Sequence, residues 1–94
     1  MSALLLFFRR AMTIRIKFFA VLRDKAGMSE LRLDLPESAT VSSAIETLVA
    51  RHPDLKPFAQ RIACAVNLDR AAPDTVLHDN DELALLPPVS GGRE

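Results

Sequence analysis

The sequence has a single cysteine, no excess of either charge and no long hydrophobic run. One cysteine cannot form an internal disulfide, which is typical of a reducing compartment, so we expect a cytoplasmic location. Twelve lysines and arginines balance twelve aspartates and glutamates, and no basic excess points to a nucleic-acid ligand. The apolar run from Ala3 to Phe8 is too short to span a bilayer, so we expect no membrane partner.

The sequence also lacks the residue clusters on which most enzymes and metal sites depend. No histidines and cysteines have the spacing of zinc ligands, no glycine-rich phosphate loop is present, and no nucleophile stands beside a base. Residues 79–82 resemble calcium ligands faintly, but they lack the loop length and the glycine, so a turn is predicted. Cys64 is predicted to be a buried core thiol. We therefore expect no metal, no bound cofactor and no catalytic side chain.

A chain of 94 residues makes a single domain. Residues 1–11 are predicted to be an unstructured extension, because a signal peptide would carry its charges before the apolar run and here Arg9 and Arg10 follow it. The domain is predicted to span residues 12–88, and residues 89–94 form a flexible tail.

Four segments alternate apolar and polar residues at a period of two, the pattern of strands with one buried face. They span residues 13–19, 30–35, 61–67 and 82–86. The inward positions are predicted to be Ile14, Ile16, Phe18, Leu31, Leu33, Leu35, Ile62, Cys64, Val66, Leu83 and Leu85. Residues 23–27 are predicted to form a polar loop in which Gly27 adopts a positive φ.

One segment has the period of a helix, and no other strong helix is expected. Thr40 is a suitable N-cap and Pro53 a stop signal. The apolar face between them consists of Val41, Ala44, Ile45, Leu48 and Val49. The order strand, strand, helix, strands predicts an α+β protein with a β-grasp fold, in which a mixed sheet of four to five strands carries one main helix on one face. The last strand is expected to lie parallel to the first, inside the sheet.

The sheet face opposite the helix is predicted to carry an apolar patch beside charged residues. The members of the patch are Phe19, Ala63, Ala65, Ala84 and Leu86. An exposed apolar patch with a charged rim is a common partner site. We expect a protein partner here, because Leu86 leads directly into the C-terminal tail.

The tail contains two glycines, which have no side chains. The residues before the charged pair Arg93 and Glu94 are Pro87, Pro88, Val89, Ser90, Gly91 and Gly92. The prolines stiffen its base, and the glycines suit a narrow channel. A small domain without catalytic groups that presents such a tail is predicted to be a substrate, with the carboxyl carbon of Gly92 as the reactive atom. A carboxylate is a poor electrophile, so a partner enzyme has to adenylate it with ATP before sulfur or an amine can replace the oxygen.

Several segments together resemble the small, sulfur-carrier subunit of molybdopterin synthase, in the MoaD/ThiS ubiquitin-like family. They are residues 18–23 with Gly27, residues 40–41, 65–67 and 79–84, and the Pro-Pro-Val-Ser-Gly-Gly ending of residues 87–92. The resemblance implies that an E1-like activating enzyme adenylates Gly92 and that a sulfurtransferase supplies the sulfur. It also implies a heterotetramer with the large synthase subunit, into which the thiocarboxylated tail inserts to donate sulfur to cyclic pyranopterin monophosphate. The chain would be a non-catalytic subunit of that complex.

Two features depart from the pattern of this family. The family often has an aromatic pair where Leu85 and Leu86 stand. Arg93 and Glu94 follow the glycines, so a protease has to remove them if Gly92 is the carrier terminus. Three alternatives stay open: a sulfur carrier for tRNA thiolation, thiamine or cysteine synthesis, a ubiquitin-like modifier joined to lysines, and a binding module that is never activated.

Overall fold

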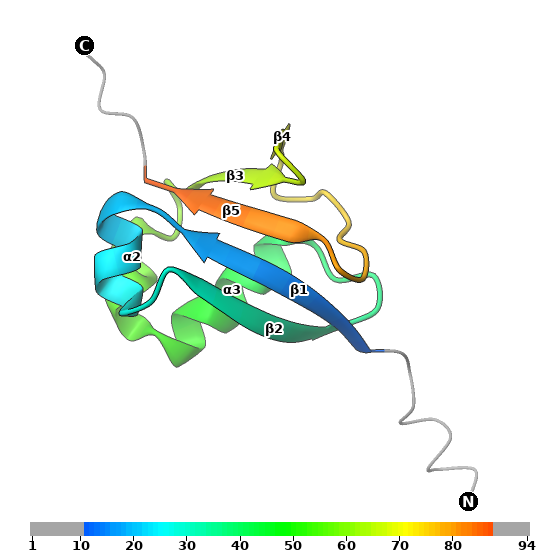
Figure 1. Ribbon diagram of the computed structural model, residues 1–94, viewed down its shortest axis with the longest axis horizontal. Helices are drawn as coiled ribbons and strands as arrows, with labels where there is room; N and C mark the ends of the chain where they lie inside the picture. The colour runs from blue at the N-terminus through cyan, green and yellow to red at the C-terminus, as the bar shows by residue number, and fades with distance from the viewer. Residues whose placement is uncertain (1–10, 88–94) are drawn as a thin grey trace, which may run out of the picture.

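A mixed sheet forms one layer of the molecule, and the main helix packs across one of its faces (Figure 1). The computed structural model describes residues 11–87. In chain order the elements are β1 (Ala11–Phe18), α2 (Ala20–Ala26), β2 (Glu30–Pro36), α3 (Val41–Arg51), the 3-10 helix η1 (Pro53–Phe58), β3 (Ala63–Val66), β4 (Asp69–Ala71) and β5 (Glu82–Leu86). This arrangement confirms the predicted α+β β-grasp fold.

The last strand lies in the middle of the sheet, as the sequence predicted. The strand order is β2-β1-β5-β3-β4, with β5 parallel to β1 and antiparallel to β3. β1 and β2 form the predicted antiparallel pair. Because β5 runs parallel to β1, the C-terminal ends of both strands lie at the same end of the sheet.

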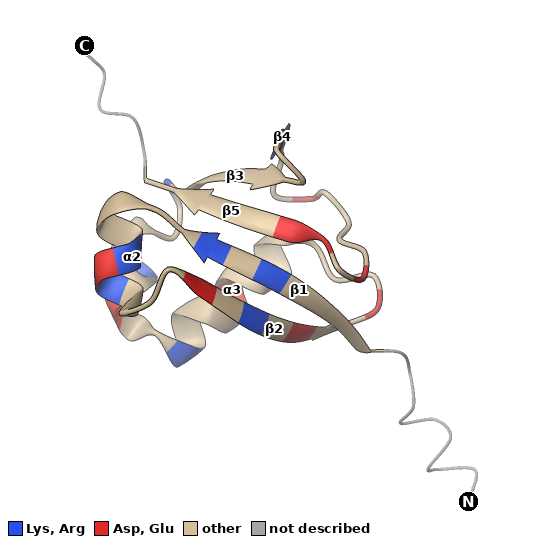
Figure 2. Cartoon of the chain, in the orientation of Figure 1, with Lys and Arg blue, Asp and Glu red and all other residues tan. Residues whose placement is uncertain are grey.

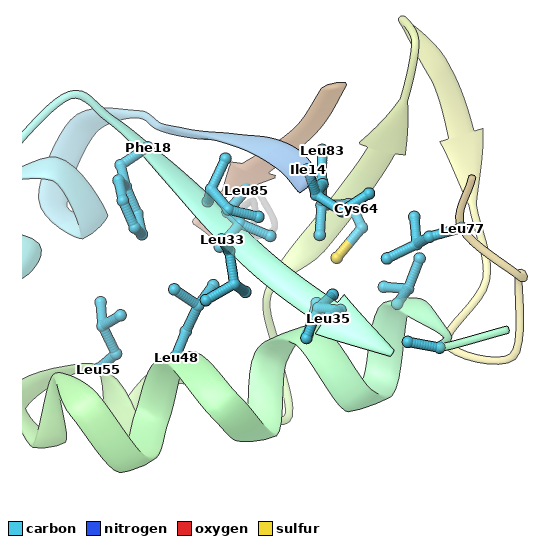
Figure 3. Packing of buried hydrophobic residues seen from close by; sticks show 14 of the residues in the cluster. Ile14, Phe18, Leu33, Leu35, Leu48, Leu55, Cys64, Leu77, Leu83 and Leu85 are labelled. Carbon is cyan, nitrogen blue, oxygen red and sulfur yellow. The ribbon is translucent and has the colours of Figure 1, made fainter. Parts of the chain in front are cut away.

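The core lies between the sheet and α3 (Figure 3). Side chains from both layers point into this space, including Phe18 and Leu33 from the sheet and Leu48 from α3. Ile14, Ile16, Leu33, Leu83 and Leu85 are at most 1% exposed, which confirms the predicted inward faces of β1, β2 and β5. Burying one such side chain stabilises the fold by about 1.5–3 kcal/mol.

The main helix begins and ends where the sequence predicted. The Thr40 hydroxyl oxygen accepts a hydrogen bond from the Ser43 backbone N–H at 3.2 Å, which is the expected N-cap contact. The helix ends at Arg51, two residues before Pro53. Leu48 on its inward face is only 1% exposed.

The prediction of a polar loop at residues 23–27 is wrong, whereas α3 is the one main helix that was predicted. Residues 20–26 form α2, whose buried side chains are Leu22 and Ala26. These two residues lie four apart on one side of a short helix whose other positions are mostly exposed, so the segment lacks a wide apolar stripe. Gly27 does adopt the predicted positive φ, at 77°, and its backbone N–H donates to the Arg23 carbonyl oxygen at 2.9 Å. The glycine therefore ends a helix instead of turning a loop.

The first strand begins earlier than predicted. β1 starts at Ala11, which pairs with Pro36, and the neighbouring Met12 is only 4% exposed. The boundary that placed residue 11 in the N-terminal extension is therefore wrong by one residue. A small exposed residue adds nothing to the alternating pattern, so the pattern could not locate this end of the strand.

Deleting residues 1–10 is expected to leave the midpoint of urea denaturation unchanged, because every pair of the β1–β2 ladder that the structure describes, from Ala11 to Lys17, is kept. Deleting residues 1–12 is the matched control. It also removes the buried Met12 side chain and should cost about 1.5–3 kcal/mol of unfolding free energy. A lowered midpoint after the shorter deletion would show that the N-terminal segment packs on the domain.

The turn between β3 and β4 holds a leucine in a conformation that favours glycine. Val66 pairs with Asp69, which leaves a two-residue turn in which Asn67 has φ 51° and Leu68 has φ 75°. Two positive φ values are typical of a type I′ turn, in which glycine is preferred at the second position. The Leu68 side chain is 85% exposed, so packing offers it little compensation.

Leu68→Gly is therefore expected to raise the free energy of unfolding by about 0.5–1 kcal/mol, because it relieves the left-handed strain of an L-residue. Urea denaturation would measure the change. Leu68→Ala is the control: it removes the exposed side chain but keeps the Cβ atom that causes the strain. Equal stability of the two variants would contradict the assignment of strain to this turn.

Candidate functional site

The face of the sheet opposite α3, here called the open face, has a charged part and an apolar part. Figure 2 shows charged residues along β1, β2 and the start of β5, and none along β3 or the rest of β5. The apolar part lies where β5 ends and the tail begins. It consists of the five residues predicted as a patch: Phe19, Ala63, Ala65, Ala84 and Leu86.

The strand register brings these five residues together. Ala63 pairs with Leu86 and Ala65 pairs with Ala84 across β3 and β5. The backbone N–H of Phe19 donates to the Leu85 carbonyl oxygen at 3.2 Å, which places Phe19 beside the end of β5. Side chains alternate along a strand, so Ala84 and Leu86 point away from the core that Leu83 and Leu85 enter.

The patch consists of three small alanines and two larger apolar side chains. Phe19 is 43% exposed and Leu86 is 38% exposed, whereas Ala84 is only 8% exposed. Ala84 is not a member of the core cluster, and it lies between its register partners Lys17 on β1 and Ala65 on β3. Exposed large apolar side chains beside small ones give a surface that another protein can fit closely.

Two ion pairs border the patch. The Glu82 carboxylate lies 3.6 Å from the Arg15 guanidinium and 3.6 Å from the Lys17 ammonium. Lys17 is also the register partner of Ala84 across β1 and β5. The cationic side chains are therefore held beside the apolar residues, which is the charged rim that the sequence predicted.

The turn before β5 is fixed by the side chain of Asp81, which is 9% exposed. Its carboxylate accepts hydrogen bonds from the Asn67 side-chain amide and from the His78 backbone N–H, both at 2.8 Å. The Asn67 side-chain oxygen accepts in turn from the Glu82 backbone N–H at 3.0 Å. This network joins the β3–β4 turn to the start of β5 and so fixes the strand that carries Ala84, Leu86 and the tail.

The turn predicted at residues 79–82 is present at Asp79 and Asn80, and β5 begins at Glu82. The Asp79 carboxylate accepts a hydrogen bond from the Thr13 backbone N–H at 2.8 Å, so this carboxylate also has a partner within the protein. Among residues 11–87, no group of three or more acidic, histidine or cysteine side chains could hold a metal ion. The sequence did not predict the contact between Asn67 and Asp81, because the two residues lie fourteen positions apart.

Cys64 is the core thiol that the sequence predicted. Its side chain is buried at 9% exposure, and burial raises the pKa of the thiol from 9.0 to about 11. The thiol therefore stays protonated near neutral pH, and a protonated thiol is a poor nucleophile.

The tail begins at the apolar end of the open face. β5 ends at Leu86, and Pro87 is the last residue that the structure describes. The predicted tail residues that lie outside the described part are Pro88, Val89, Ser90, Gly91 and Gly92. The patch and the root of the tail thus form one candidate site.

In the part of the chain that the structure describes, no helix has the length and apolar character needed to cross a lipid bilayer.

Comparison with known proteins places residues 16–92 in the ThiS family. The chain is 30% identical over 79 residues to the molybdopterin synthase sulfur carrier subunit of Arabidopsis thaliana, covering 84% of this chain and 82% of the relative. It is 38% identical over 84 residues to small archaeal modifier protein 1 of Haloferax volcanii, covering 81% and 97% of the two chains.

Solved structures agree with this assignment. A crystal structure of the Haloferax volcanii modifier protein matches with a TM-score of 0.74, covering 85% of this chain and 99% of the other. A putative molybdopterin converting factor subunit 1 from Pyrococcus furiosus matches with a TM-score of 0.75 at 31% identity, covering 83% and 99%. The chain therefore belongs to the ThiS family and has its ubiquitin-like β-grasp fold.

Proposed function

We propose that this chain is the sulfur carrier of a molybdopterin synthase and that the carboxyl group of Gly92 carries the sulfur. The observation that carries the proposal is the course of β5. This strand runs through the centre of the sheet and ends at Leu86, inside the apolar patch of the open face. A partner that docks on the patch would therefore receive the Gly-Gly tail at a fixed point.

The chemistry needs only the terminal carboxylate of Gly92. A carboxylate oxygen attacks the α-phosphorus of ATP, pyrophosphate leaves, and the product is an acyl-adenylate. The terminal sulfur of a persulfide on the sulfurtransferase then displaces AMP from the acyl carbon and forms an acyl disulfide. A thiol cleaves its S–S bond, which leaves the thiocarboxylate on Gly92 and a disulfide between that thiol and the donor cysteine. An activating enzyme and a sulfurtransferase supply these steps. The one cysteine of this chain is a poor nucleophile, because burial raises the pKa of the Cys64 thiol.

The partner that accepts the sulfur-loaded tail is the large subunit of the synthase, in a heterotetramer. The Arabidopsis relative is named as a subunit, which supports a partner of this kind. Gly92 lies six positions after Leu86 in the sequence. At about 3.3 Å per residue, an extended tail reaches about 20 Å beyond the sheet. This length is enough to enter a channel in a partner and deliver the sulfur to cyclic pyranopterin monophosphate.

A peptidase has to act before the carrier can be loaded. In the sequence, the carbonyl carbon of Gly92 is joined to Arg93 through an amide, and Glu94 follows. An amide is not a substrate for ATP-dependent acyl activation. The side chains of Arg93 and Glu94 would also have to lose their hydration in a narrow channel, which is costly for charged groups. Hydrolysis of the bond between Gly92 and Arg93 supplies the free carboxylate.

Reconstitution tests this proposal. The full chain and a chain ending at Gly92 would each be mixed with ATP, an activating enzyme, a sulfur donor, the large synthase subunit and cyclic pyranopterin monophosphate. We expect the shorter chain to yield molybdopterin directly. The full chain should yield it only after a peptidase is added. Failure of the shorter chain to form a thiocarboxylate would contradict the carrier role. A thiocarboxylate without molybdopterin would instead favour a carrier for tRNA thiolation, thiamine or cysteine synthesis.

The second candidate is a ubiquitin-like modifier. The 38% identity to the Haloferax volcanii modifier protein favours it. The same acyl-adenylate would then react with a lysine amine and form an isopeptide bond. Conjugates of higher mass, found in the host and lost when Gly92 is deleted, would support this candidate over the sulfur carrier.

A further inference from the structure

We propose that the outer edge of β2 binds the same edge of a second copy of this chain, so that two five-stranded sheets join as an antiparallel, two-fold dimer. This contact does not depend on the proposed function, because β2 lies two strands away from β5, which carries the tail.

β2 is the longer of the two edge strands. It has seven residues, whereas β4 at the opposite edge has three. Among the described residues, β2 pairs only with β1, and Figure 1 shows it as the outermost strand of its side. A long edge strand presents a row of backbone groups that can pair with another strand.

The hydrogen-bond pattern shows which backbone groups point outward. The Phe18 backbone N–H donates to the Ser29 carbonyl oxygen at 3.0 Å, so these two residues form a hydrogen-bonded pair of the antiparallel ladder. Such pairs alternate with pairs that are not hydrogen-bonded. The backbone N–H and C=O groups of Leu31, Leu33 and Leu35 therefore face β1. Those of the exposed residues Glu30, Arg32 and Asp34 face outward.

Within the described part of the chain, one charge on the same strand has no partner of opposite charge. Arg32 lies directly opposite Arg15 in the register of β1 and β2. This pair is not hydrogen-bonded through the backbone, so its side chains are close, and like charges in this position are destabilising. The Glu82 carboxylate lies 3.6 Å from the Arg15 guanidinium, whereas within residues 11–87 no carboxylate lies within ion-pair distance of Arg32.

A second copy can supply that carboxylate. When two β2 strands meet antiparallel and are centred on Leu33, Arg32 of each copy lies opposite Asp34 of the other. Both residues have outward backbone groups, so each of the two Arg32–Asp34 pairs forms two backbone hydrogen bonds and one pair of opposite charges. This register overlaps the whole strand from Glu30 to Pro36. It ends at Pro36, which has no N–H and whose carbonyl oxygen already accepts from the Ala39 backbone N–H at 3.1 Å.

Sedimentation of the full chain over a concentration series tests the dimer through a charge exchange. Arg32→Asp places two acidic pairs across the interface, and Asp34→Arg places two basic pairs there. We expect each single variant to associate about tenfold or more weakly than the unchanged chain. An equimolar mixture of the two variants restores opposite charges at both pairs, so it should form a heterodimer with an affinity near that of the unchanged chain.

Two exposed sites away from β2 give matched controls. Arg61→Asp and Glu46→Arg change the net charge by the same amounts and should leave the dimer intact. Thermal unfolding of every variant would show that the fold is kept. The proposal is overturned if the unchanged chain stays monomeric at millimolar concentration, if the single reversals leave association unchanged, or if the mixture fails to associate.

Discussion

A chain that ends at residue 92 and carries Gly92→Ala is expected to keep its fold and to lose sulfur transfer by about a hundredfold. The residue follows the end of β5 by six positions in the sequence, so the free energy of unfolding should change by less than about 0.5 kcal/mol. The added methyl group stands beside the acyl carbon that has to be adenylated and then placed near its acceptor. A misplacement of about 1 Å at a reacting centre can cost about a hundredfold in rate.

Single-turnover formation of molybdopterin, started from the preformed thiocarboxylate, would measure the transfer step separately from adenylation. Ser90→Ala in a chain of the same length is the control, because it changes a tail side chain away from the reacting carbon. Normal turnover of the Gly92→Ala chain would remove Gly92 from the mechanism.

Leu86→Lys is expected to weaken binding to the large synthase subunit by about thirtyfold or more, which corresponds to about 2 kcal/mol. The side chain is 38% exposed on the open face and pairs across the sheet with Ala63. A lysine at this position would bring a charge into an apolar contact, where it would lose its hydration without gaining a carboxylate. The fold should be affected less than binding, because the residue points away from the core.

Titration calorimetry against the large subunit would compare this variant with Leu68→Lys. Leu68 is also an exposed leucine, at 85%, but it lies in the β3–β4 turn outside the patch. The control should bind like the unchanged chain. If Leu86→Lys binds equally well, the docking surface lies elsewhere on the molecule.

The strands could be predicted from the sequence because each has one buried face. Ile14, Ile16 and Phe18 alternate with polar residues, and all three are at most 2% exposed. The helix α2 gave no comparable signal. It buries only Leu22 and Ala26, and its N-cap, Phe19, makes no side-chain capping bond. Packing against the rest of the fold can stabilise a short helix, so its sequence does not need a helical pattern of apolar residues.

The candidate site was predictable in part for the same reason. Once Leu83 and Leu85 are assigned to the core, the alternation of β5 assigns Ala84 and Leu86 to the open face. The bond between Asn67 and Asp81 was not predictable, because it depends on how the β3–β4 turn approaches the start of β5. The low exposure of Ala84 likewise depends on its neighbours across β1 and β3.

In the proposed function, Gly92 becomes the C-terminal residue and carries the sulfur. The most direct test is intact mass spectrometry of the protein purified from its native host. We predict a main species that ends at Gly92, part of which shows the mass gain of one oxygen exchanged for sulfur. A population that keeps Arg93 and Glu94, in a host that still makes molybdenum cofactor through this gene, would contradict the claim.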